Sequence, residues 1–153
     1  MVLEHFHPEI NSISTPLLST LSSLTRLEHL TICADHVFNS DGLEKFWFFS
    51  FIPPVTDLIK TAPILKHLKI AFNFWLNASA HISETLEHFC PSLVHLLTEC
   101  RATSITLCVS ANCHLDRSFE ATFLEMARSA LTGCAEVNQL VEQDVLVIRF
   151  STI

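Results

Sequence analysis

The chain has 153 residues, which is enough for one domain with a sizeable core. Hydrophobic residues make up 49% of it and charged residues only 16%, a composition too apolar for an intrinsically disordered chain. Acidic residues outnumber basic ones by 16 to 9, and the basic residues are scattered. We therefore expect no nucleic-acid partner, because binding to a phosphate backbone needs clustered Lys and Arg.

The first residues of the chain carry no recognisable export signal. Glu4 and Glu9 lie where such a signal would have a basic stretch and then an apolar one. The most apolar run, Phe46–Val55, contains two prolines and is shorter than the roughly 20 residues that cross a bilayer. We expect a soluble intracellular protein, cytoplasmic or nuclear and without a membrane partner, whose six cysteines are free thiols.

One pattern recurs four times along the chain and predicts a helix that leads into a strand. Three copies begin with a proline sixteen residues before an aliphatic residue, and the fourth begins with a threonine instead. The pairs are Pro16 and Ile32, Pro54 and Ile70, Pro91 and Leu107, and Thr132 and Ile148. Proline at the first helical position removes no hydrogen bond that the helix needs, so we expect helices to begin at these prolines.

Apolar residues at helical spacing follow the first two prolines, and each copy ends in a short alternating segment. The helical residues are Leu17, Leu18, Leu21 and Leu24 in the first copy and Val55, Leu58, Ile59 and Ala62 in the second. The alternating segments are 30–32, 68–70, 105–107 and 146–148, and such alternation indicates a strand with one buried face. Equivalent positions are chemically alike, as in Leu30, Leu68, Ile105 and Leu146.

Three further helices are expected between the copies, at residues 42–51, 83–89 and 118–131. The longest has Asp116 or Ser118 as its candidate cap. Its expected apolar face consists of Phe119, Phe123, Leu124, Ala127, Ala130 and Leu131.

Strands separated by helical crossovers at a near-constant spacing predict an α/β fold with a parallel sheet of about four strands. We expect a short leucine-rich-repeat-like solenoid with its helices on the convex side. Residues 15–153 would form this single domain of about four repeats, after an N-terminal flank of residues 1–14. The alternative is a closed or doubly wound α/β fold, which usually places glycines at its ligand loops. The chain contains only Gly42 and Gly133, and this favours the repeat arrangement.

Three segments carry a resemblance to a known family: 24–32 (LTRLEHLTI), 62–70 (APILKHLKI) and 140–148 (LVEQDVLVI). They resemble the degenerate leucine-rich repeats of uncharacterised F-box-type proteins of basidiomycete fungi. The resemblance covers roughly residues 15–150 and implies a protein-interaction module without catalytic activity, equivalent to the substrate-recognition repeats of a ubiquitin-ligase receptor. The F-box that docks the ligase adaptor has several dozen residues and does not fit into residues 1–14. A truncated gene model, a degenerate paralogue and a free binding module all stay open as explanations.

Outward positions of the predicted strands give the candidate contact surface for a protein partner. If Leu30 and Ile32 face the core, their sequence neighbours face outward, and the same holds in the other copies. The predicted binding residues are His29, Thr31, His67, Lys69, Ser104, Thr106, Val147 and Arg149, with Cys33, Ala71, Cys108 and Val145 beside them. The alternative is a sheet face that is only solvated.

Two groups of aromatic residues allow two interpretations. They are Phe46, Trp47, Phe48, Phe49 and Phe51, and then Phe72, Phe74 and Trp75. An exposed aromatic cluster would indicate a hydrophobic docking patch. We favour the filling of the core between helices and sheet, because aromatic side chains provide much of the buried area of a core.

No metal, cofactor or catalytic site is expected. His29 and His67 should lie on adjacent strands about 5 Å apart, but a structural zinc site needs four converging ligands and no third is evident. Neither a glycine-rich nucleotide-binding motif nor G-x-S-x-G is present. An alternative hypothesis is a small α/β enzyme with a Cys–His site in the loop of Asn112, Cys113, His114 and Asp116. A third is an incomplete or degenerate gene product with no independent function.

Overall fold

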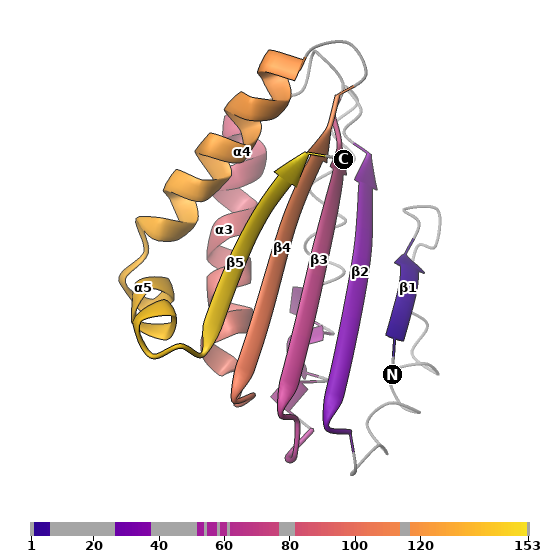
Figure 1. Ribbon diagram of the computed structural model, residues 1–153, viewed down its shortest axis with the longest axis vertical. Coiled ribbons are helices and arrows are strands. Elements are labelled where there is room, and N and C mark those ends of the chain that lie inside the picture. Colours follow the sequence, from indigo (N-terminus) through magenta and orange to yellow (C-terminus); the bar gives the residue numbers. More distant parts are fainter. Residues whose placement is uncertain are drawn as a thin grey trace.

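The structure, a computed structural model, describes residues 2–6, 27–37, 52–53, 55–57, 59–60, 62–76, 82–113 and 117–152. The strands are β1 (Val2–Phe6), β2 (His29–Val37), β3 (His67–Trp75), β4 (Ser104–Asn112) and β5 (Leu146–Thr152). The helices are α3 (Ile82–Glu99), α4 (Arg117–Thr132) and α5 (Ala135–Glu142), and the residues described between 52 and 60 are also helical. Figure 1 shows how these elements are arranged.

The five strands form one parallel sheet in which the strand order follows the sequence (Figure 1). The predicted α/β fold with a parallel sheet and helices between its strands is therefore confirmed. The four predicted alternating segments lie in β2, β3, β4 and β5. β1 is an additional strand within the segment that we expected to be a flank, and its pairing with β2 is irregular between Leu3 and Phe6.

The equivalent positions found in the sequence are neighbours across the sheet. Leu30 pairs with Leu68, Leu68 with Ile105, and Ile105 with Leu146. The next inward positions, Ile32, Ile70, Leu107 and Ile148, are aligned in the same way. The first set is at most 2% exposed. Each such aliphatic side chain stabilises the fold by about 1.5–3 kcal/mol relative to an exposed one, so this alignment explains why the register is fixed.

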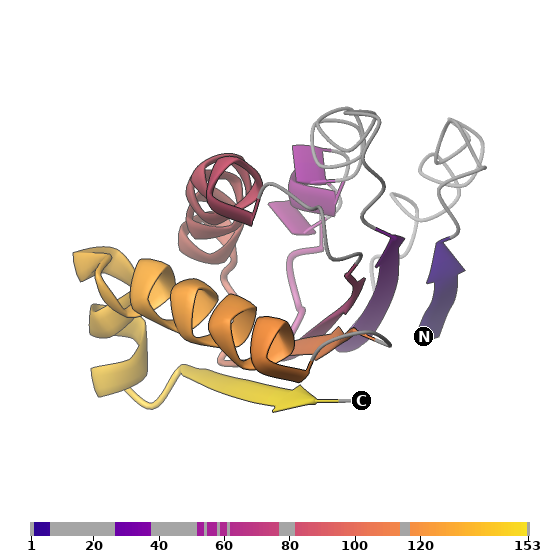
Figure 2. The same cartoon turned by 90° about the horizontal axis from the view of Figure 1, so that it is seen from above.

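All described helices lie on one side of the sheet, as the two views in Figures 1 and 2 agree. α4 packs against β4 and β5, and α3 packs against α4 and α5. The core fills the space between these helices and the sheet, and its largest fully buried side chains are Phe72, Phe74, Phe123, Leu30, Ile32, Leu68, Ile70, Leu93, Leu96 and Leu97. The other side of the sheet has no cover among the described elements.

Helix α3 corrects the prediction that a helix begins at Pro91. The helix runs from Ile82 to Glu99, with Pro91 in its interior and exposed. Leu86, Cys90, Leu93 and Leu97 are buried at spacings of three and four residues across the proline. Burial of this continuous stripe outweighs the missing hydrogen bond at Pro91, which costs about 3 kcal/mol in a helix interior. The predicted helix at 83–89 is therefore only the first half of α3.

The predicted helix at 118–131 agrees with α4, except at two positions. Ala130 is exposed, whereas its neighbour Leu131 in the same last turn of α4 is fully buried. Ser118 lies inside the helix rather than capping it, and its backbone carbonyl accepts a hydrogen bond from Thr122 Oγ1 at 2.9 Å. Asp116, the other candidate cap, lies outside the described residues.

The fourth copy begins later than its sequence suggested. Thr132 is the last residue of α4, and its carbonyl accepts a hydrogen bond from Asn138 Nδ2 at 2.7 Å. The helix of this copy is α5, with Cys134 at its N-cap position and Val137 fully buried. Val137, Ile59 and Leu96 each lie five residues after the first residue of their copy of the sequence pattern, and all three are buried. Of the helical residues expected in the first two copies, Leu17, Leu18, Leu21, Leu24 and Leu58 lie outside the described residues, as does the helix at 42–51.

Candidate functional site

The uncovered side of the sheet brings all eight predicted contact residues together. We call it the open face and define it by the outward residues of β2 to β5 (the side toward the viewer in Figure 1). These residues are His29, Thr31, Cys33, His67, Lys69, Ala71, Asn73, Trp75, Ser104, Thr106, Cys108, Ser110, Asn112, Val147, Arg149 and Ser151. Asp35 and Val37 occupy equivalent positions on β2. Val145 precedes β5 and is half-buried.

The open face is arranged as rows of residues that run across the strands. The first row is His29, His67 and Ser104, and the second is Thr31, Lys69, Thr106 and Val147. The third row is Cys33, Ala71, Cys108 and Arg149. Adjacent strands in a sheet are about 4.8 Å apart, so each row presents side chains at close and regular spacing.

Exposure differs along these rows. His29, His67, Lys69, Val147 and Arg149 are exposed, with Val147 at 48%. Most residues between them are half-buried, because each is flanked by outward side chains of two neighbouring strands. The result is a largely flat surface of hydroxyl, thiol and small apolar groups, with charged groups at a few positions.

The two histidines of the first row lie face to face. Their ring centroids are 4.5 Å apart and their planes are inclined by 14°. The backbone around them is held by hydrogen bonds from the amides of Lys66 and His67 to the carbonyl of Glu28, at 2.9 and 3.0 Å. These contacts explain why the two rings, which belong to strands joined by a long crossover, stack so closely.

An ion pair lies directly beside the stacked rings. Lys66 Nζ donates a hydrogen bond to Glu28 Oε2 at 3.0 Å. This hydrogen bond and the charge of Lys66 lower the pKa of the Glu28 carboxyl, and the charges of His29 and His67 lower it further. Glu28 is therefore a carboxylate throughout the pH range in which histidines titrate.

The aromatic residues of the second cluster divide between the two sides of the sheet. Phe72 and Phe74 are fully buried, and the ring of Phe74 packs against that of Phe123 at 5.0 Å between centroids. These two residues fill the core as we favoured. Trp75 is instead half-buried on the open face. Phe46, Trp47, Phe48, Phe49 and Phe51 lie outside the described residues.

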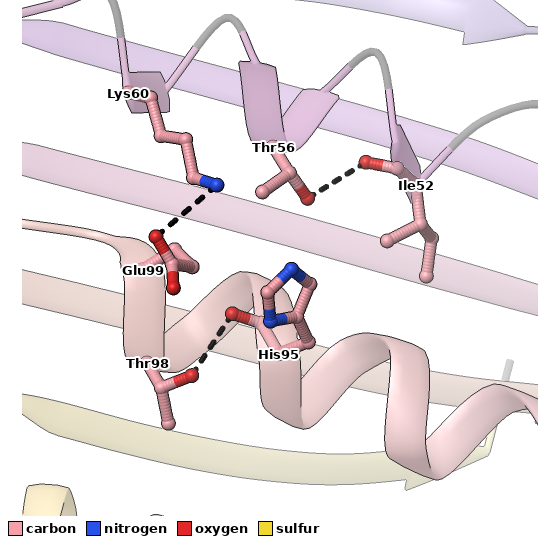
Figure 3. A network of polar contacts seen from close by, with 6 residues as sticks. All are labelled: Ile52, Thr56, Lys60, His95, Thr98 and Glu99. Carbon is pink, nitrogen blue, oxygen red and sulfur yellow. Dashed lines mark hydrogen bonds and ion pairs between the residues drawn. The ribbon is translucent and has the colours of Figure 1, made fainter.

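A small groove lies on the helical side, between the helical residues 52–60 and α3 (Figure 3). It has a volume of about 240 Å³ and is lined by Ile52, Pro53, Thr56, Asp57, Lys60, Ser92 and His95. Lys60 Nζ lies 3.2 Å from Glu99 Oε2, and the ring of His95 points toward the facing helical segment. The groove is smaller than the roughly 300–1,000 Å³ of a typical ligand pocket. The groove cannot be predicted from the sequence, because its two walls come from segments more than thirty residues apart.

The residues of the enzyme hypothesis do not converge within the described part of the chain. Cys113 is buried in the core, whereas Asn112 lies on the open face opposite Trp75. The carbonyl of Asn112 accepts a hydrogen bond from the amide of Leu76 at 2.8 Å, which holds the end of β4 in place. His114 and Asp116 lie outside the described residues.

The six cysteines are free thiols, as expected from their irregular spacing. Cys33 and Cys108 share a row but are separated by Ala71 on the strand between them, which places them about 10 Å apart. Burial raises the pKa of the Cys90 thiol to about 11, and burial also raises that of Cys100. Such thiols are poor nucleophiles at neutral pH, because the reactive form is the thiolate.

Within the described ranges, no three His, Cys, Asp or Glu side chains are placed to hold a metal ion. In the same part of the chain, no helix is long and apolar enough to cross a membrane. Comparison of the chain with protein-family models, with curated proteins and with solved structures finds no match.

Proposed function

We propose that this chain is a protein-interaction module of leucine-rich-repeat type, a short solenoid whose open face contacts a partner protein. The observation that supports this proposal is a parallel sheet whose strand order follows the sequence and whose described helices all lie on one side. In repeat proteins of this architecture, each unit packs on its neighbours and the outward residues of successive strands form an extended binding surface.

The dimensions of the open face suit a single protein contact. The four strands β2 to β5, each about 4.8 Å wide, and the nine-residue length of β2, β3 and β4 give a face of about 20 Å by 30 Å. Its area of about 600 Å² is close to the roughly 800 Å² that one partner contributes to a standard interface. Its half-exposed Trp75 and exposed Arg149 belong to the residue types that are enriched at interface centres.

The resemblance of residues 24–32 and 62–70 to F-box-type repeats adds a more specific proposal. In it, the chain is related to the substrate-recognition part of a ubiquitin-ligase receptor and has no catalytic activity of its own. The alternative enzyme hypothesis has less support. Of the residues of its loop site, Asn112 and Cys113 are described, and they lie on opposite faces of the sheet.

A charge-reversal comparison tests the proposed contact surface. Tagged wild-type chain, the open-face variant Lys69→Glu/Arg149→Glu and the control Lys60→Glu/Arg128→Glu would each be used to capture proteins from the native cells. The control carries the same change of net charge on the helical side. We expect the open-face variant to lose a stoichiometric partner that wild type and control both retain, with all three chains folded by circular dichroism.

Two other results would speak against parts of the proposal. Retention of the same partner by both variants would remove the open face as the contact surface. Recovery of chaperones alone with folded wild-type chain would favour the incomplete gene product. Recovery of a ubiquitin-ligase adaptor would support the relation to a ligase receptor.

A further inference from the structure

Charge is distributed unequally between the two sides of this acidic chain. The chain has a formal net charge of −7, but the exposed charged side chains described on the open face are basic: Lys69 and Arg149, with His29 and His67 beside them. Asp35 is the one carboxylate residue at an outward position of β2 to β5. The helical side carries the surface carboxylates Asp57, Glu99, Glu125, Glu136 and Glu142 and the cations Lys60, Arg117 and Arg128, and Lys60 and Arg128 pair with Glu99 and Glu125.

We infer that the open face binds an extended, carboxylate-rich segment of a partner protein across the rows that contain the stacked histidines, Lys69 and Arg149. This inference rests on the proposed function and names the chemistry of the partner. The reason is charge complementarity, which steers association and excludes wrong partners. The described helical side has more carboxylates than cations on its surface, so it offers such a segment less attraction than the open face.

The spacing of the basic groups matches an extended chain. Lys69 follows His67 by two residues on β3, which is about 6.6 Å along the strand. Arg149 lies in the next row and two strands away, which adds about 10 Å across the sheet. Side chains on one side of an extended peptide repeat about every 6.6 Å, so neighbouring carboxylates can reach His67 and Lys69. Arg149, about 12 Å from Lys69, is within reach of a carboxylate about two repeats further on. Thr106 lies beside Lys69 on β4, the strand between β3 and β5, and its hydroxyl offers a further hydrogen-bond donor.

The stacked histidines make this binding depend on pH. Imidazole changes its charge between pH 5 and 8. Among the described residues, the groups that face the pair are the Glu28–Lys66 ion pair, Lys69 on the same strand and the uncharged Ser104 in the same row. A carboxylate is attracted to an imidazolium and not to a neutral imidazole, so binding should strengthen as the pH falls.

A polyanionic nucleic acid fits the same surface less well. Only Lys69 and Arg149 carry a permanent positive charge there, and phosphate-backbone binding draws on several such groups. The net charge of −7 also repels a long polyanion. A short segment with few carboxylates meets the basic row without that penalty.

The test uses the full chain and a fluorescein-labelled peptide of alternating glutamate and serine, with a lysine–serine peptide as control. Fluorescence anisotropy would be measured at pH 6 and pH 8. We expect the acidic peptide to bind about threefold more tightly at the lower pH and the basic peptide not to bind. Lys69→Gln/Arg149→Gln should weaken binding roughly tenfold, whereas Lys60→Gln on the helical side should not change it.

A second pair of variants separates the role of the histidines from that of the two permanent charges. His29→Asn/His67→Asn should bind the acidic peptide with equal affinity at both pH values while the chain remains folded. Equal affinity of wild type at both pH values, unchanged binding by Lys69→Gln/Arg149→Gln, or tighter binding of a single-stranded oligonucleotide than of the peptide would overturn the inference. If the acidic peptide fails to bind but the charge-reversed open face still loses its captured partner, the proposed function stands and this inference alone fails.

Discussion

Replacing Pro91 by alanine tests whether α3 is one continuous helix. More than two helical turns lie on each side of Pro91, whose side chain is exposed. Alanine would supply a backbone amide that can donate to the carbonyl of Glu87, four residues earlier in α3. The substitution removes no buried apolar surface, so its effect comes from the backbone alone.

The structure gives both the sign and the size of the expected change. Proline is about 3 kcal/mol less favourable than alanine in a helix interior. Loss of proline also frees the unfolded chain, which offsets about 0.4–1 kcal/mol of this gain. Pro91→Ala should therefore stabilise the chain by about 2 kcal/mol and raise Tm by roughly 4–8 °C for a chain of this size.

Thermal unfolding followed by circular dichroism at 222 nm would measure this shift, with Pro63→Ala as the matched control. Pro63 is exposed and occupies the second position of a turn closed by a hydrogen bond from Leu65 N to Ala62 O at 3.3 Å, where proline is favoured. The free energy of unfolding of the Pro63→Ala control should fall by about 0.5–1 kcal/mol. A Pro91→Ala chain that is no more stable than wild type, beside a control that behaves as expected, would mean that the helix begins at Pro91.

Three further predictions concern the sheet, the ion pair and a buried thiol. Leu68→Asp should unfold the chain, because a buried unpaired carboxylate costs more than about 4 kcal/mol of folding free energy. The neighbouring variant Lys69→Asp should keep a native circular dichroism spectrum. Native spectra for both variants would mean that the register is wrong. Lys66 lowers the folded-state pKa of Glu28, so their ion pair adds stability above the unfolded pKa of Glu28 and loses it as the pH falls through the folded value. Lys66→Met should raise that pKa toward 4.5, and an NMR titration that shows no change would contradict the pairing. Burial raises the pKa of the Cys90 thiol to about 11, so iodoacetamide at neutral pH should modify Cys90 more slowly than the half-exposed thiols of the open face. A mass-spectrometric time course would measure the order of modification. Early modification of Cys90 would show that this thiol is accessible.

The sheet could be predicted because its signal is local and repeated. Leu30, Leu68 and Ile105 recur at nearly constant spacing, each with an aliphatic partner two residues later. Parallel strands with one buried face require this alternation, and a slip of one residue would turn it toward solvent. The same alternation assigns Lys69 and Arg149 to the open face from the sequence alone.

Other features depend on contacts that the local sequence does not contain. Pro91 has the local features of a helix start, and only the buried residues on both sides of it show a longer helix. β1 has five residues and irregular pairing, so it carries too little alternation to be recognised. For His29 and His67, the sequence predicts the distance between their backbones but not the stacking of their rings. The groove at Lys60 and His95 forms where two helical segments meet, and the sequence of either segment alone does not indicate this contact.

The uninterrupted pairing of β2, β3 and β4 determines by how much this sequence can lengthen or shorten. Each residue of β3 from His67 to Trp75 has a partner at a constant offset, 38 residues earlier on β2 and 37 residues later on β4. Tandem duplication of residues 67–103 would add a strand whose two neighbours present side chains that the sheet already accommodates. Insertion of a single residue within β3 would instead exchange the inward and outward side chains that follow it. Selection should therefore tolerate the gain or loss of whole units and remove small insertions within strands, so that relatives of this chain differ in length by steps of about one crossover.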